Sequence, residues 1–101
     1  MNKPKLASLL GLAQKAGKLA SGEVAVEKAV QAGKARLLLV AADAADNTRK
    51  SYRDMAVFYE VACHEGLSKD ELGQATGRPA RAAVAILDAG FAKAIEATLL
   101  C

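Results

Sequence analysis

The sequence predicts an α/β fold, a three-layer α/β/α sandwich with a four-stranded mixed sheet. Two continuous apolar runs, 37–42 and 82–87, have the length of strands that are covered on both faces. Segments with helical periodicity alternate with these runs, as they do when helices lie on both sides of a sheet. At 101 residues, the chain is expected to form one domain over 1–101.

Helical and extended segments follow one another along the whole chain. The expected elements are a helix over 3–16, a short strand near Leu19, a helix over 22–32, a strand over 37–42, a polar loop over 43–47 leading into a third helix, a strand over 61–64, a short helix from Ser68, a strand over 82–87 and a helix over 89–100. Gly17, Gly33 and Gly77 stand where three of the helices are expected to end.

The first two helices are predicted from apolar residues at helical spacing. Leu6, Leu9, Leu10 and Ala13 repeat at i, i+3, i+4 and i+7 in the first helix. The core face of the second helix consists of Val26, Ala29 and Val30, and this helix begins at a Ser-Gly pair suited to a helix start. Each helix is therefore expected to bury one face against the sheet.

The later helices are predicted from capping signals and one apolar stripe. Asp46 or Asn47 is expected to cap the third helix, and Ser68 with Glu71 forms a capping box for the fourth. The apolar stripe of the third helix consists of Tyr52, Met55, Ala56 and Tyr59. Its aromatic residues, Phe58 included, are expected in the core, which leaves no aromatic platform for stacking single-stranded nucleic acid.

Composition and charge narrow the class of protein. No run approaches the roughly 18 apolar residues of a membrane span, and no secretory cleavage site follows the first helix, so the expected location is the cytoplasm. Residues 1–53 carry ten Lys and Arg but four Asp and Glu, a net charge of +6, whereas 54–101 carry a net charge of −3. A domain whose positive charge lies mostly in one half of the chain indicates a polyanionic partner. Many soluble domains nevertheless reach a pI of about 9.0, as this chain does, without such a partner.

Catalytic and cofactor motifs are weak. Five residues separate the two glycines of 11–18, one more than a phosphate-binding loop has, and Leu19 stands where that loop needs Ser or Thr. Cys63 and His64 are neighbours, so on a strand they would point to opposite faces. One histidine and two distant cysteines, Cys63 and Cys101, supply neither a zinc site nor a disulfide framework. The chain is therefore expected to be non-enzymatic, with no metal and no cofactor.

Two cationic segments are candidate anion-binding sites. A helix that starts at Gly22 offers free amides in its first turn, with Lys18 and Lys28 in flanking positions. The loop before the last strand carries Arg78 and Arg81, which can bind phosphate or stack on a base. Each segment also has a purely structural interpretation, as a helix cap with solvated lysines and as a solubilising loop.

A series of short motifs resembles one known family. In order, the motifs are Leu9-Leu10-Gly11-Leu12-Ala13, Ala16-Gly17-Lys18, Ser21-Gly22-Glu23, Val26-Glu27-Lys28, Gly33-Lys34-Ala35, Asp43-Ala44, Asp46-Asn47-Thr48, Leu72-Gly73, Gly77-Arg78, Arg81 and Gly90-Phe91-Ala92-Lys93. Together they resemble the bacterial YlxQ-type branch of the ribosomal protein L7Ae/L30e family. The resemblance implies an α/β/α sandwich that binds structured RNA, with ribosomal RNA and ribonucleoprotein components as candidate partners and kink-turns as a frequent target in the wider family.

The resemblance also implies a binding surface. A Gly-x-Asn-Glu-x-x-Lys segment opens the second helix in the wider family, and its glycine and lysine fall on Gly22 and Lys28. Val24 and Ala25 replace the Asn and Glu, and Glu23 lies one residue early, so backbone, lysine and arginine contacts are expected to supply the affinity. The residues expected to bind RNA are Lys18, Gly22, Glu23, Lys28, Lys34, Arg78 and Arg81.

Two other functions stay open on the sequence. A protein-interaction module on the same fold would dock an acidic partner on the basic face, where the apolar Val24 and Ala25 beside Lys28 suit a dry contact. A small hydrolase using Cys63 is the third class, and it has only one histidine to serve as its base. Nucleic acid that co-purifies with the protein would separate the first alternative from RNA binding.

Overall fold

Four short strands form the middle layer of the protein and five helices surround them in the computed structural model, which describes residues 1–100. The elements are α1 (Lys3–Lys15), β1 (Leu19–Ser21), α2 (Glu23–Gln31), β2 (Leu37–Val40), α3 (Asp46–Phe58), β3 (Ala62–Glu65), α4 (Lys69–Ala75), β4 (Ala83–Ile86) and α5 (Ala89–Leu100). None of the described helices has the length and hydropathy needed to cross a lipid bilayer.

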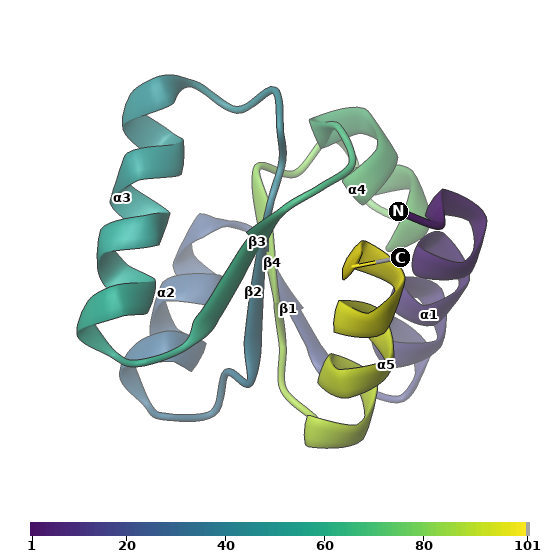
Figure 1. The fold of residues 1–101 in the computed structure, drawn as a ribbon, viewed down its shortest axis with the longest axis horizontal. Helices are drawn as coiled ribbons and strands as arrows, with labels where there is room; N and C mark the ends of the chain where they lie inside the picture. Colours follow the sequence, from purple (N-terminus) through teal and green to yellow (C-terminus); the bar gives the residue numbers. More distant parts are fainter. Residues whose placement is uncertain (101) are drawn as a thin grey trace.

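The sheet is mixed and has the strand order β1-β4-β2-β3. β2 and β3 are parallel, with Leu37 opposite Ala62, whereas β4 runs antiparallel to both β1 and β2. Helices α2 and α3 cover one face of the sheet, and α1, α4 and α5 cover the other (Figure 1). The three-layer α/β/α sandwich with a mixed four-stranded sheet is thus confirmed.

The strand directions give the molecule two distinct ends. The carboxyl ends of β1, β2 and β3, the starts of α2, α3 and α4, and the 77–82 loop lie together at the top of Figure 1, which we name the apical end. The final turns of α1, α2 and α3 and the start of α5 lie at the opposite, basal end. The residues predicted to bind RNA lie at one of these two ends or on a helix face between them.

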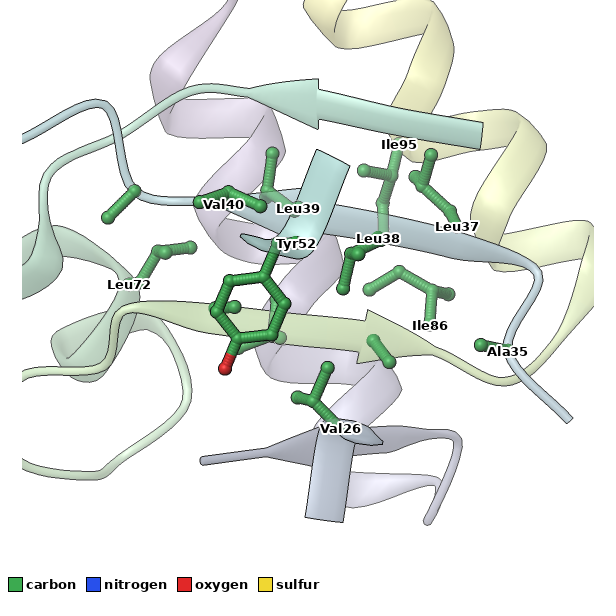
Figure 2. Close-up of a cluster of buried hydrophobic side chains, with 14 of the residues drawn as sticks. Val26, Ala35, Leu37, Leu38, Leu39, Val40, Tyr52, Leu72, Ile86 and Ile95 are labelled. Atoms are coloured by element: carbon green, nitrogen blue, oxygen red, sulfur yellow. The ribbon is translucent and has the colours of Figure 1, made fainter. Parts of the chain in front are cut away.

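The core lies on both faces of the two central strands. Every residue of β2 and β4 is buried, which confirms the two covered strands, although they are shorter than the predicted 37–42 and 82–87. Val26 of α2 and Tyr52 of α3 lie among the sheet side chains (Figure 2). Each such side chain contributes about 1.5–3 kcal/mol to folding when it leaves water. The central strands therefore provide a rigid base for the loops at either end.

Two expectations for the third helix are wrong. Ala45 is its N-cap and no side chain caps it, because Asp46 already lies inside the helix and pairs with Arg49. Phe58 is 78% exposed and Tyr59 is 40% exposed, so the two aromatic residues at the helix end lie outside the core. Only Tyr52 among the three is buried, because Phe58, six residues further on, lies on a different side of α3 and Tyr59 follows the last helical residue.

The capping box of the fourth helix is confirmed. The Glu71 amide donates to Ser68 Oγ at 3.1 Å, and the Ser68 amide donates to Glu71 Oε1 at 2.8 Å.

Both ends of the described chain lie near α4. The amide of Asn2 donates to the Thr98 carbonyl at 3.0 Å, so the beginning of α1 is joined to the last turn of α5. Cys101, which was expected to form no disulfide, lies outside the described residues.

Candidate nucleic-acid interface

The start of α2 is an open helix end at the apical face. Gly22 is its N-cap, with a φ of 92° that favours glycine, and no side chain donates or accepts a capping hydrogen bond there. The first intrahelical bond runs from the Val26 amide to the Gly22 carbonyl at 2.9 Å. The amides before Val26 are the free donors that make a helix start attractive to anions.

Arg81 lies directly beside this helix end. Its Nε is 3.9 Å from the position that a Cβ on Gly22 would occupy. That Nε is buried and has no hydrogen-bond acceptor among the described residues, while Nη1 donates to the Ala80 carbonyl at a long 3.4 Å. A buried donor without an acceptor costs about 1–3 kcal/mol. The guanidinium fork is of the kind that binds phosphate, and the helix end beside it is also suited to an anion.

Lys28 lies on the same side of α2 as the open end. Together with 21–25 it lines a shallow groove of about 470 Å³. Val24 is 66% exposed in this groove, and Ala25 is exposed next to it. The groove therefore offers the cation of Lys28, the carboxylate of Glu23 and an apolar strip, with no side chain at positions 24 and 25 that can hydrogen-bond a base edge.

The 77–82 loop is held against α4 by close backbone packing. The Arg78 amide donates to the Gly73 carbonyl at 2.8 Å, and the Arg81 amide donates to the Lys69 carbonyl at 3.1 Å. A Cβ on Gly73 would lie 2.4 Å from the Pro79 carbonyl oxygen, so only glycine permits this approach. Gly73 thus positions the two arginines, a role for which the sequence offered only a lone Leu-Gly motif.

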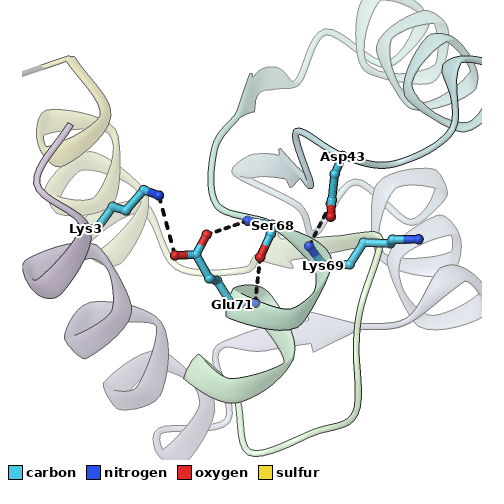
Figure 3. Close-up of polar contacts among 5 residues, drawn as sticks. All are labelled: Lys3, Asp43, Ser68, Lys69 and Glu71. Atoms are coloured by element: carbon cyan, nitrogen blue, oxygen red, sulfur yellow. Dashed lines mark hydrogen bonds and ion pairs between the residues drawn. The ribbon is translucent and has the colours of Figure 1, made fainter.

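Several acids at the apical end are already partnered (Figure 3). Asp43 Oδ1 accepts a hydrogen bond from the Lys69 amide at 2.8 Å. Glu71 accepts from the Ser68 amide and pairs with Lys3 Nζ at 3.5 Å. The backbone hydrogen bond from Ser68, followed by the charge of Lys3, lowers the pKa of Glu71. These carboxylates are therefore bound within the protein and repel an incoming phosphate less than free ones would.

Arg49 partners two further apical acids. It pairs with Asp46 and, at 3.3 Å, with Glu65, and the hydrogen bond to Asp46 is the main reason that the pKa of Arg49 is raised. In contrast, Lys28, Arg78 and Arg81 form no ion pair within the described part of the chain. Of these, Arg81 lies beside the open helix end and Lys28 lines the groove that begins there.

The structure does not bring all seven predicted residues together. Gly22, Glu23, Lys28, Arg78 and Arg81 lie on the α2 groove and the neighbouring loop at the apical side. Lys18 precedes β1 and Lys34 follows α2, so both lie at the basal end of the sheet. The seven predicted residues therefore do not form one surface, because Lys18 and Lys34 lie apart from the other five.

Comparison with known proteins matches this arrangement to one family. The profile of the ribosomal protein L7Ae/L30e/S12e/Gadd45 family matches residues 4–96. The chain belongs to this family. The L7Ae-type chain is 42% identical over 92 residues to the RNA-binding protein YlxQ of Enterococcus faecium, covering 91% of the chain and 88% of that relative. It is 40% identical over 91 residues to the RNA-binding protein YlxQ of Bacillus subtilis, with 90% and 91% covered.

Solved structures show the same L7Ae-type fold. A Bacillus halodurans protein of unknown function superposes with a TM-score of 0.91 at 35% identity, over 96% of this chain and 98% of that one. The Giardia lamblia 15.5kD RNA binding protein superposes with a TM-score of 0.77 at 21% identity, over 95% and 82%. The second similarity is one of fold alone.

The residues that a hydrolase would use do not form an activated group in this L7Ae-type protein. Burial, followed by the charge of Glu65, raises the pKa of the Cys63 thiol. His64 Nε2 lies 2.8 Å from Glu96 Oε2, which draws the imidazole toward α5. Nucleophilic cysteines are activated by a lowered pKa, and the shift at Cys63 is in the opposite direction. Within residues 1–100, no three His, Cys, Asp or Glu side chains form a group that could hold a metal ion.

Proposed function

We propose that this protein is a non-enzymatic RNA-binding domain that holds structured RNA against its apical side. The observation that carries the proposal is the position of the buried, unpaired Arg81 Nε beside the open helix end at Gly22. The names of the two YlxQ relatives, which describe RNA-binding proteins, support it.

The interface binds an RNA backbone through a few distinct contacts. The amides at the start of α2 and the guanidinium of Arg81 bind one phosphate, because the Arg81 side chain lies next to Gly22, the N-cap of that helix. Lys28 neutralises a second phosphate along the groove. Exposed Arg78 clamps the strand or stacks on a base from the 77–82 loop.

Selection among RNAs then depends on shape more than on base edges. Val24 and Ala25 contact sugars and base faces by van der Waals packing, since neither side chain has a hydrogen-bonding group. A kink-turn would have to be recognised without the Asn and Glu side chains of the wider family. We therefore assign the protein to folded RNA of a ribonucleoprotein, with ribosomal RNA of the cytoplasm as the first candidate.

The test is a charge reversal in the groove, Lys28→Glu, measured with a fluorescent ribosomal RNA fragment at moderate salt. We expect at least about tenfold weaker binding, or about 1.4 kcal/mol. Lys50→Glu is the matched control, because Lys50 lies on the exposed face of α3, paired at 3.3 Å with Asp54. Far-UV circular dichroism should be the same for both variants. Equal affinity of Lys28→Glu and wild type would refute the apical interface.

One observation favours a second function. Val24 is 66% exposed next to Lys28, as a residue in a dry protein contact would be before its partner binds. An acidic protein partner would then occupy the groove. A preparation that carries no nucleic acid and binds no RNA fragment, yet captures an acidic protein in a Lys28-dependent way, would support this function against the first.

A further inference from the structure

The basal end carries a charge that the apical interface does not use. Its cations are Lys15, Lys18, Lys34, Arg36 and Lys93, which we name the basal cluster, and its acids are Glu60, Asp88 and Glu96, the last of which lines the same pocket as Arg36 and Lys93. Five positive and three negative charges leave a net +2, out of the formal net +3 of the whole chain. The remaining nine cations and eight acids of the sequence leave +1. Most of the net positive charge of the chain therefore lies at this end.

Backbone hydrogen bonds fix two of these cations on either side of β4. The Leu87 amide donates to the Lys18 carbonyl at 2.8 Å, and the Arg36 amide donates to the Ile86 carbonyl at 2.7 Å. Lys18 and Arg36 are therefore about two strand spacings, roughly 10 Å, apart. Each lies one residue before a strand, so its backbone is anchored to the end of the sheet.

The rest of the cluster surrounds this pair. Lys34 is two residues before Arg36, and Lys93 lines the same shallow pocket of about 280 Å³ as Arg36. All five side chains are exposed, and none forms an ion pair with any residue in 1–100. A row of unpaired cations on a rigid base is the arrangement that neutralises a phosphodiester backbone.

Helix ends explain only part of this cluster. A cation in the last turn of a helix is stabilised by the negative end of the dipole, which accounts for Lys15. Lys18 and Lys34 lie beyond their helices, just after Gly17 and Gly33. Lys93 lies near the amino end of α5, where the dipole disfavours a cation. Stabilisation by helix dipoles therefore does not account for most of the cations in the basal cluster.

An exposed aromatic pair lies at the margin of the cluster. The rings of Phe58 and Tyr59 meet edge to face with centroids 4.9 Å apart at the end of α3. Since Leu37 is opposite Ala62, residue 36 is next to 61 in the sheet, two positions from Tyr59. Exposed rings beside cations are a means of stacking unpaired bases, which an acidic protein does not offer.

We propose that the basal cluster is a second RNA-binding surface, which binds the phosphate backbone of another RNA segment with Phe58 at its edge. It rests on the proposed function, since it takes the ligand to be RNA. The two surfaces lie at opposite sides of a molecule about 30 × 26 × 25 Å in extent, so one protein bridges two RNA segments.

The test compares the RNA affinity of a variant that lacks three positive charges of the basal cluster with that of a variant that lacks three positive charges elsewhere. The basal variant is Lys18→Gln with Lys34→Gln and Arg36→Gln, and the matched control is Lys5→Gln with Lys50→Gln and Arg53→Gln. All six side chains are exposed or only partly covered, so both proteins should keep the circular dichroism spectrum and melting temperature of wild type. The probe is an RNA hairpin with a single-stranded tail.

We expect the basal variant to lose about tenfold in affinity at about 100 mM salt, with the salt slope of log K smaller by about 2, since each phosphate contact contributes about 0.7–0.9. The control should change by less than about threefold. With donor-labelled and acceptor-labelled hairpins, wild type should give energy transfer and the basal variant none. Phe58→Ala should weaken binding of the tailed hairpin more than that of a blunt one.

The outcomes separate this inference from the function on which it rests. If the basal variant binds and bridges as wild type does while Lys28→Glu loses binding, the apical interface stands and the basal surface is refuted. If the basal and control variants lose affinity equally, the effect is one of net charge and the basal surface is again refuted. If wild type binds no RNA at all, both proposals fail.

Discussion

The contact between Gly73 and the 77–82 loop gives a sharp prediction about stability. In Gly73→Ala, the new Cβ would lie 2.4 Å from the Pro79 carbonyl oxygen and 2.8 Å from the Arg78 carbonyl oxygen. Ordinary carbon-oxygen contacts begin near 3.3 Å, so α4 and the loop must separate by about 1 Å. Both of those contacts are backbone, which cannot rotate away as a flexible side chain would.

Two opposing effects decide the magnitude for Gly73→Ala. Alanine inside a helix is favoured over glycine by about 1 kcal/mol. Overpacking of a close contact costs about 1–3 kcal/mol. Weakening the 2.8 Å hydrogen bond from the Arg78 amide to the Gly73 carbonyl costs about 1 kcal/mol more. The clash therefore prevails, and we expect a net loss of about 1–3 kcal/mol in the free energy of unfolding.

Urea denaturation and thermal melting measure this loss. A net 1 kcal/mol corresponds to a fall of about 4–8 °C in the melting temperature of a domain of this size. Gly11→Ala is the matched control inside α1, because its Cβ would meet only the Ala75 carbonyl oxygen at 3.3 Å. A Gly73→Ala protein as stable as wild type would refute the reasoning, since helix propensity would then outweigh the contact. The same variant should bind RNA more weakly, because the loop carries Arg78 and Arg81.

Two further predictions concern pH and thiol chemistry. Because the pKa of Glu71 is lowered by the Ser68 amide and Lys3, its contribution to stability is present above the unfolded pKa near 4.3 and is lost as pH falls through the folded value. Glu71→Gln keeps a capping oxygen, so its urea midpoint should fall less between pH 7 and pH 3 than that of wild type, and equal falls would contradict the assignment. In a Cys101→Ser background, Cys63 should react with iodoacetamide at pH 8 more slowly than free cysteine, because burial raises its pKa. A faster reaction would show that the thiol is activated after all.

The fold was predictable where burial leaves a strong pattern. A strand covered on both faces has no polar face, so β2 and β4 are continuous apolar runs in the sequence. The Ser68 and Glu71 capping box is equally local, because its two hydrogen bonds join residues three apart. Both features depend on neighbours in the chain, which is the information that a sequence displays directly.

The position of the site was only partly predictable, because strand direction is not local. Lys18 is four residues before Gly22, yet the three residues of β1 carry the chain about 10 Å across the sheet between them. Lys34 is likewise carried to the far end by α2, whose nine residues span about 13.5 Å. Proximity in sequence therefore grouped cations that the sheet separates.

The predictions for the third helix, that Tyr59 is buried and that Asp46 caps the helix, were wrong for a different reason. Tyr59 follows Tyr52 by seven residues, a spacing that returns a side chain to the same helix face. The helix ends at Phe58, and Glu60 takes a left-handed φ of 58°, so the chain leaves the helix path before Tyr59 can pack inward. Asp46 similarly has a side chain suited to capping, but it lies inside the first turn, where it pairs with Arg49. Helical periodicity holds only as far as the helix continues.

The hydrogen bond between the Asn2 amide and the Thr98 carbonyl brings the two ends of the described chain together. The helices and strands could therefore be connected in a different order along the chain and still pack in the same way. Because the ends of the described chain are adjacent, a short glycine-rich linker can join them, and new ends can be opened in the exposed turn at Glu60. Such a circularly permuted protein would begin with β3 and finish with α3 while keeping every layer in place. It would also free both ends for surface attachment, away from the apical loops.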